Sequence, residues 1–277
     1  MKIGVVIPTY NRAELLQRAI NSVLGQSYQN YVVCVVEDCS PDNTKEVMQK
    51  YTNNEKVNYI RLEKNGGVNV ARNKAIEYLT SKEVACDYIT MLDDDDYFTL
   101  DAFKEVVKYI NEKEIDWLIF NRVYPNGEKI TKSTKYGEVS YLDDQYCGTT
   151  ISGDAVMFIS KKLIANKKFE ESFRAREYLF FLLLDYESPM YVVDYDAVVC
   201  EYLPDGMTHS QKKESKEEKS RVRQIEQNIL KTIDLSFELL EYKRNNNLMK
   251  NACSKNDFFK AFKYFIKLVK WKLKLLF

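Results

Sequence analysis

The sequence has one histidine, no pair of cysteines in CxxC spacing and no apolar run of about 18 residues. It therefore lacks the cysteine and histidine spacing of a zinc site, and its apolar runs are too short for a membrane-spanning helix. The cysteines lie partly within apolar runs, which is typical of a reducing cytoplasm rather than of a disulfide framework. No signal peptide precedes the first apolar run, so we expect a cytoplasmic protein.

Neither sign of charge prevails, because 41 basic residues balance 41 acidic residues. A balanced chain has no overall field that would attract nucleic acid, and we expect no nucleic-acid partner. The length of 277 residues is enough for one large α/β domain and a smaller appendage.

Strands and helices alternate along the first hundred residues. Short apolar runs predict strands at 3–7, 31–36, 57–62 and 87–92. Between them we expect a helix capped by Asn11 and two further helices, at 44–51 and about 70–79. This alternation predicts a parallel sheet with helices on both faces, whose ligands bind beyond the carboxyl ends of the strands.

The second half of the chain is less regular. We expect a helix at 101–112, strands at 115–120, 154–160 and 191–199, a polar loop at 124–150, a mobile loop at 203–220 and a helix at 217–243.

Four consecutive aspartates, Asp93–Asp96, directly follow the strand expected at 87–92. Their mutual repulsion costs stability at a strand end unless a cation offsets it. Mg²⁺ or Mn²⁺ fits this need, because both prefer carboxylate oxygens together with substrate phosphates. The alternative is a solvated acidic turn in which Asp96 caps a helix.

Three segments, in order, resemble family 2 glycosyltransferases of the GT-A fold: VVIPTYNRAELLQRAINSVLGQSYQNYVVCVVEDCSPDNT, NGGVNVARNKAI and YITMLDDDDYF. The likeness is close over about residues 1–100 and looser to about 210. It implies an inverting, metal-dependent transfer of a sugar from a nucleotide-diphospho-sugar, with UDP-sugars first, to an acceptor hydroxyl. It also implies a Rossmann-like, mixed and mostly parallel sheet flanked by helices, with a C-terminal helical appendage.

The resemblance also divides the chain into parts. Residues 1–205 are expected to form the GT-A catalytic domain, with a nucleotide-sugar half at 1–100 and an acceptor half at 101–205. A mobile loop and helix follow at 206–250, and a basic amphipathic tail at 251–277.

The resemblance assigns a nucleotide site to the first half. Pro8, Thr9 and Tyr10 would line the nucleotide pocket, Asp38 would accept a hydrogen bond from the base, and Arg72 would belong to the same site. The alternatives are that Tyr10 packs on the core and that Arg72 forms a surface ion pair.

The same resemblance assigns roles within the acidic run. Asp94 resembles the acid that contacts the ribose, and Asp95 the carboxylate that holds Mn²⁺ or Mg²⁺ against the diphosphate. Asp93 and Asp96 flank that ligand and could bind through water. His209, the only histidine, is a further metal-ligand candidate from a closing loop, or else simply an exposed residue.

An inverting transfer also needs a general base that takes the proton of the attacking hydroxyl. Relatives place an acidic pair before a helix in the second half, and here FEESFRAREYLFFLLL has Arg176-Glu177 at that place. Glu177 is the predicted base. Glu170 and Glu171 lie nearby, and Glu177 could instead cap or ion-pair with its helix.

The last twenty residues carry six lysines and no acid. Five of these lysines fall on one helical face and the aromatic residues on another, which predicts a helix lying in an anionic membrane interface. The alternative is a terminal helix docked on the catalytic domain. A membrane-bound tail would suit a lipid-linked or glycan acceptor in surface polysaccharide or glycolipid assembly.

Two other functions compete with sugar transfer. A sugar nucleotidyltransferase also needs a nucleotide pocket and acidic metal ligands, but it usually opens with a glycine-rich loop, and residues 7–12 contain no glycine. A non-catalytic nucleotide-sugar-binding module would keep the fold and lose activity, which the intact Asp93–Asp96 run and Glu177 disfavour.

Overall fold

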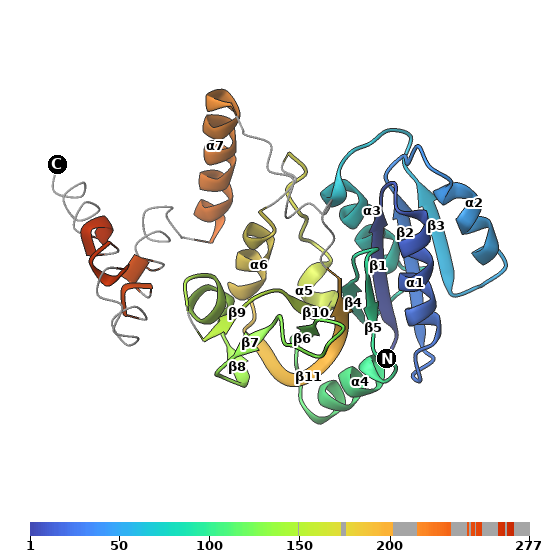
Figure 1. Ribbon diagram of the computed structural model, residues 1–277, viewed down its shortest axis with the longest axis horizontal. Coiled ribbons are helices and arrows are strands. Elements are labelled where there is room, and N and C mark those ends of the chain that lie inside the picture. Colours follow the sequence, from blue (N-terminus) through green and yellow to red (C-terminus); the bar gives the residue numbers. More distant parts are fainter. Residues whose placement is uncertain are drawn as a thin grey trace.

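The computed structural model describes residues 1–148, 150–172, 176–201 and 215–233, with single residues and short runs between 243 and 268. Its centre is a nine-stranded sheet in the order β3-β2-β1-β4-β10-β6-β11-β5, with β8 paired to β11. Helices flank this sheet, and α7 contacts α6 on the side of the molecule away from α2 (Figure 1).

The first four strands of the sheet are parallel, as predicted: β1 (Ile3–Thr9), β2 (Tyr31–Glu37), β3 (Val57–Arg61) and β4 (Tyr88–Met91). Their connections contain α1 (Ala13–Leu24), α2 (Thr44–Met48), a 3₁₀ turn η1 (Gln49–Tyr51) and α3 (Val68–Thr80). Every residue of β1 and β2 is buried, because both faces of the strands are covered.

Side chains alternate between the two faces of these strands and so build two separate cores. Val6 and Val36 pack with Leu79 of α3 on one face. Val5 packs with Leu16 of α1 on the other. The predicted arrangement of helices on both faces is therefore confirmed.

The second half mixes strand directions. Its strands are β5 (Asp96–Phe98), β6 (Trp117–Val123), β7 (Lys132–Ser133), β8 (Gly137–Val139), β9 (Ile151–Ser152), β10 (Ala155–Ser160) and β11 (Met190–Cys200). β10 runs antiparallel to β4 and β6, whereas β11 runs parallel to β6 and antiparallel to β5. The helices are α4 (Ala102–Glu112), α5 (Lys161–Ile164), α6 (Tyr178–Asp185) and α7 (Lys216–Thr232).

Three local expectations need correction. The polar segment 124–150 is not all loop: it contains β7, β8 and the π-helical segment η2 (Tyr141–Tyr146), which are too short to show a period. Asp96 does not cap a helix, because it begins β5. Asn11 does not cap α1 either: it has a φ of 56°, and the carboxylate of Asp42 accepts the hydrogen bond of the Ala13 N–H, at 3.2 Å.

The C-terminal expectations are tested only in part. The helix expected at 217–243 is present over its first part as α7, which ends at Thr232, while residues 234–242 lie outside the described residues. Most of the loop expected at 203–220 lies outside them too. Within the described part of the chain, no helix has both the length and the apolar character needed to cross a membrane.

Candidate active site

The carboxyl ends of three parallel strands bring the predicted site residues together. β1 ends at Thr9, which is in register with Glu37 at the end of β2, and the aspartate run begins two residues after β4. The Thr9 hydroxyl donates to Asp94 Oδ2 at 2.7 Å, and the N–H of Asp38 donates to the Thr9 carbonyl at 2.9 Å. The sheet edge therefore places Thr9, Asp38 and Asp94 side by side.

Arg12, directly before α1, neutralises the middle of the aspartate run. Its Nη1 lies 3.2 Å from Asp94 Oδ1 and 2.7 Å from Asp95 Oδ2. Arg12 was not predicted as a site residue, although its position just after the end of β1 was a usable signal.

Arg72 and Arg122 neutralise the two ends of the run. Arg122 Nη1 lies 2.8 Å from Asp96 Oδ2 and 3.4 Å from Asp93 Oδ2. Arg72 Nη2 lies 3.4 Å from Asp93 Oδ1. Arg122 comes from β6 and was not predicted, because nothing in the sequence indicates that this strand faces Asp93–Asp96.

Burial sets the protonation of these carboxyl groups. It raises the pKa of Asp94 to about 6 and that of Asp96 to about 7, although Arg122 opposes the rise at Asp96. Burial also raises the pKa of Asp95, and the charge of Asp93 adds to this. At Asp93 the two arginines Arg122 and Arg72 outweigh burial and lower the pKa. A bound cation would compete with protons for these oxygens.

The donor set suits a cation that is held jointly by protein and substrate. Among the described residues, no group of three or more acidic, histidine or cysteine side chains is arranged to hold a metal by itself. Asp95 offers one carboxylate with a side chain that is 19% exposed at the sheet edge. Mg²⁺ is commonly bound by one or two carboxylates plus substrate phosphates, so the residues fit Mg²⁺ or Mn²⁺. His209, the other ligand candidate, lies outside the described residues.

Glu177 lies within this network. Arg72 Nη1 donates to Glu177 Oε1 at 2.9 Å, so that one buried arginine joins Glu177 to Asp93. Glu177 precedes α6 but makes no side-chain cap hydrogen bond, which excludes the capping role considered above. The Arg72 alternative is also wrong, because this side chain is only 10% exposed and its ion pairs lie inside the site.

The nearby acids have other partners. Glu171 Oε1 accepts a hydrogen bond from Asn73 Nδ2 at 2.9 Å, and Glu170 Oε1 accepts one from the N–H of Ser172 at 3.0 Å. These contacts turn both acids toward their own loop and toward α3. Glu177 is thus the acid of this segment that contacts Arg72.

Asp38 holds the turn before α3. Its carboxylate oxygens accept hydrogen bonds from the N–H groups of Gly66 and Gly67, at 2.6 and 2.8 Å. Gly67 has a φ of 91°, a conformation that favours glycine. Tyr10 is 47% exposed at the same edge, so it does not pack on the core, whereas Pro8 is buried in β1. The contact of Asp38 with a base stays a prediction.

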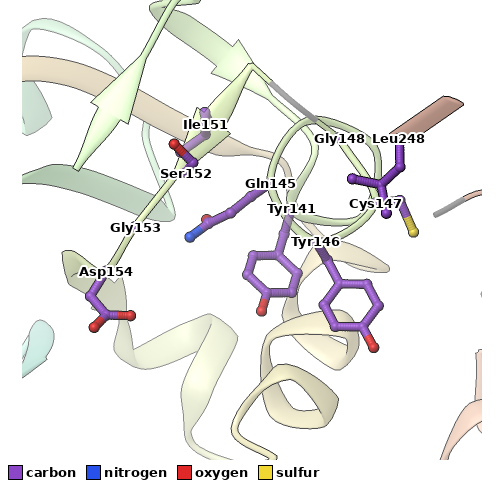
Figure 2. Close-up of a pocket in the computed structure, with 10 residues that line it drawn as sticks. All are labelled: Tyr141, Gln145, Tyr146, Cys147, Gly148, Ile151, Ser152, Gly153, Asp154 and Leu248. Carbon is purple, nitrogen blue, oxygen red and sulfur yellow. The ribbon is translucent and has the colours of Figure 1, made fainter. Parts of the chain in front are cut away.

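A cavity of about 410 Å³ is lined in part by Tyr146, whose ring stacks on Tyr178, the residue after Glu177. Tyr141, Gln145, Ser152 and Asp154 are among its lining residues, and the Gln145 amide extends between the tyrosine ring and the Ser152–Asp154 segment (Figure 2). Burial raises the pKa of Tyr141, and the charges of Tyr146, Glu177 and Asp154 add to the rise. Gln145 Oε1 is buried and has no hydrogen-bond partner among the described residues.

The sequence profile of glycosyl transferase family 2 matches residues 4–173, more than half of the chain. The chain belongs to this family. The matched residues include the Thr9–Asp94 pair, the aspartate run and the three arginines that neutralise it, while Glu177 lies four positions beyond the match.

Two relatives show how far the likeness extends. The putative teichuronic acid biosynthesis glycosyltransferase TuaG of Bacillus subtilis (strain 168) is 28% identical over 158 residues, 56% of this chain and 61% of that protein. The poly(ribitol-phosphate) beta-N-acetylglucosaminyltransferase TarS of Staphylococcus aureus (strain Mu50 / ATCC 700699) is 31% identical over 136 residues, 48% of this chain and 23% of that protein. The matches thus span less than two thirds of either relative.

A solved structure confirms the GT-A fold. The crystal structure of S. aureus TarS 1–349 in complex with UDP-GlcNAc has a TM-score of 0.70 with this family 2 chain, at 23% identity. The superposition covers 91% of this chain and 73% of the other. It therefore includes both halves of the curved sheet.

Proposed function

We propose that this family 2 protein transfers a sugar, with inversion, from a UDP-sugar to an acceptor hydroxyl during assembly of a cell-surface polysaccharide or glycolipid. One observation carries the proposal: Arg72 joins Glu177 to Asp93, beside the Thr9–Asp94 pair at the strand ends. A carboxylate suited to accept a proton thus lies beside carboxylates suited to hold a nucleotide diphosphate. The names of TuaG and TarS, and the UDP-GlcNAc bound to TarS, support this choice of reaction.

The donor side would use the residues at the strand ends. Tyr10 and Asp38 would contact the base, Asp94 the ribose, and Asp95 would hold Mn²⁺ or Mg²⁺ against the diphosphate. The cation supplies positive charge that stabilises the leaving nucleoside diphosphate. Thr9 fixes the orientation of Asp94 through their hydrogen bond, at 2.7 Å.

The acceptor side would use Glu177. A carboxylate oxygen of Glu177 takes the proton of the acceptor hydroxyl as that oxygen bonds to the anomeric carbon. The bond from this carbon to the diphosphate oxygen breaks on the opposite face, and its electron pair leaves with the nucleoside diphosphate. Attack opposite the leaving group inverts the anomeric configuration, and Arg72 keeps Glu177 oriented for it.

The cavity that Tyr146 lines has the chemistry of a sugar site. Sugar hydroxyls are hydrogen-bond donors and acceptors, and the amide of Gln145 and the carboxylate of Asp154 can bind them. We therefore place the acceptor ring in this cavity.

The C-terminal segment supports a peripheral membrane location on the cytoplasmic face. Among its described residues, Phe262 is 62% exposed, Phe265 is 51% exposed and Ile266 is 40% exposed. Exposed apolar side chains alternating with lysines are typical of a helix that lies in a membrane interface. Such a helix would bring the enzyme to a lipid-linked acceptor.

The competing functions are weaker. Family 2 membership favours sugar transfer over nucleotidyl transfer, and the Arg72-bound Glu177 argues against a purely binding role. The proposal is tested directly by incubating the protein with a panel of nucleotide-sugars and Mn²⁺ and measuring the nucleotide that is released from each donor. Turnover of a UDP-sugar supports the proposal. If donors bind but none is turned over when acceptor glycans are present, the protein is instead a non-catalytic nucleotide-sugar-binding module.

A further inference from the structure

Helix α7 reaches the Glu177 segment through one buried carboxylate. Glu226 of α7 has a side chain that is only 5% exposed, and its Oε1 lies 2.6 Å from Arg176 Nη1. The hydroxyl of Tyr178 donates to the same oxygen at 2.8 Å. One oxygen of Glu226 thus holds the residues on both sides of Glu177.

The backbone of Arg176 in turn holds Glu177. Its N–H donates to Glu177 Oε2 at 3.1 Å, while Arg72 donates to Oε1 at 2.9 Å. Arg176 has a φ of 98°, a conformation that is strained for a residue other than glycine. Such strain persists only where surrounding contacts maintain it, and the Glu226 ion pair is a contact of this kind.

A buried acid on α7 is not explained by packing alone. Ile225 and Ile229 pack partly buried against the core, and Leu230 is fully buried in it. A well-packed apolar residue at position 226 would stabilise such an interface at least as well as a buried ion pair. The acid instead supplies the negative charge that pairs with the guanidinium of Arg176.

The same carboxylate also supports the wall of the cavity. The Tyr178 ring stacks on the Tyr146 ring, with centroids 4.7 Å apart and an interplanar angle of 22°, and Tyr146 lines the cavity. The contact of α7 with Tyr178 therefore extends to the proposed acceptor site.

We propose that Glu226 is a positioning residue for the transfer reaction: by holding Arg176 and Tyr178 it fixes the carboxylate of Glu177 against Arg72. The inference rests on the proposed function in taking Glu177 as the base. Helix α7, which lies beyond the part of the chain that matches the family profile, is then needed to orient the proposed general base.

The test compares Glu226→Gln with Glu217→Gln, a matched change at an exposed position of the same helix. Glu226→Gln keeps the shape of the side chain and removes its charge from Arg176. We expect hydrogen–deuterium exchange to accelerate in peptides that cover 176–185, and kcat to fall about tenfold or more, because small misplacements of a catalytic group are costly. The KM for the nucleotide-sugar should stay within about twofold, since the donor residues are untouched.

Tyr178→Phe removes only one hydrogen bond to Glu226 and should give a smaller change of the same kind, and Glu226→Asp should recover part of kcat. Exchange in 176–185 that is unchanged in folded Glu226→Gln and Tyr178→Phe proteins would overturn the contact. Faster exchange with an unchanged kcat would overturn its role in positioning Glu177. A wild-type protein that turns over no nucleotide-sugar would count against the proposed function, and with it the positioning role, while the exchange result would still decide whether α7 orders the segment.

Discussion

Arg72 and Glu177 are 105 residues apart in the sequence, and their side chains form an ion pair of 2.9 Å in the structure. The pair joins α3, from the nucleotide half of the sheet, to the start of α6, from the other half. Arg72 also contacts Asp93, so the proposed base and the acidic run share one guanidinium. Both halves of the fold are therefore needed to complete the site.

Glu177→Gln should retain donor binding and lose most of the turnover. The amide keeps the shape and still accepts a hydrogen bond from Arg72, but it cannot take the proton of the acceptor hydroxyl. A loss of about 10²–10⁴ in kcat is expected for a general base. Steady-state transfer assays with Glu170→Gln and Glu171→Gln as controls measure this. If either control is inactive while Glu177→Gln is near wild type, the role of base moves to that residue.

Asp95→Asn should abolish transfer while leaving the fold intact. The carboxylate offers an oxygen at the sheet edge, and its loss removes the protein's hold on the cation that would neutralise the diphosphate. Nucleotide binding measured by calorimetry should become insensitive to Mn²⁺, and circular dichroism should be unchanged. Full activity of the wild-type protein in EDTA would rule out the metal-dependent mechanism.

In the absence of metal, the free energy of unfolding should fall as the pH rises from 5 to 8. The pKa of Asp94, about 6, and that of Asp96, about 7, both exceed the ordinary 3.8, so the folded state binds more protons between these values. The contribution of these two carboxyl groups to the free energy of unfolding is fully present below their ordinary pKa. It is lost as the pH rises through their pKa in the folded state. One pKa unit corresponds to about 1.4 kcal/mol, so the full loss is about 3 kcal/mol for the shift of about two units at Asp94 and about 4 kcal/mol for the shift of about three units at Asp96.

Urea unfolding at pH 5.5 and at pH 8 measures this difference. Asp96→Asn should reduce the difference in free energy of unfolding between the two pH values, because the amide still accepts a hydrogen bond from Arg122 and does not titrate. The lowered pKa values of Asp42, Asp144 and Asp194 act in the opposite direction but only below about pH 4, near the ordinary carboxyl pKa. If Asp96→Asn shows the same pH dependence of the free energy of unfolding as the wild type, the Asp96 carboxyl does not cause that dependence.

Deletion of residues 256–277 should leave hydrolysis of a soluble nucleotide-sugar nearly unchanged and sharply reduce sedimentation with anionic liposomes. Each lysine near such a surface contributes about 1 kcal/mol, and the exposed Phe262 and Phe265 add apolar insertion that salt does not screen. Neutral liposomes are the control. If the truncated protein has a lowered melting temperature and the full-length protein does not bind liposomes, the tail is instead a helix that packs on the catalytic domain.

The sequence predicted where most residues of the proposed donor side meet. Apolar runs with short polar turns located β1, β2, β3 and β4, and parallel strands with right-handed crossovers necessarily bring their carboxyl ends to one edge. The sequence alone therefore predicts that Thr9, Asp38 and Asp94 meet. The short strands β5, β7, β8 and β9 were missed, because two or three residues carry no detectable period.

The sequence by itself determined the alternation of elements and the strand ends at which the aspartates gather, because these follow from local periodicity and chain chirality. Only the tertiary structure decided which charges compensate each other. Arg122 pairs with Asp96, 26 residues away in the sequence, and Arg72 pairs with Glu177, 105 residues away. Glu226 contacts Arg176 and Tyr178, which are 50 and 48 residues away. Such pairs depend on how sheet and helices pack, and many surface arginines and acids in the same sequence could form other pairs at little cost in free energy.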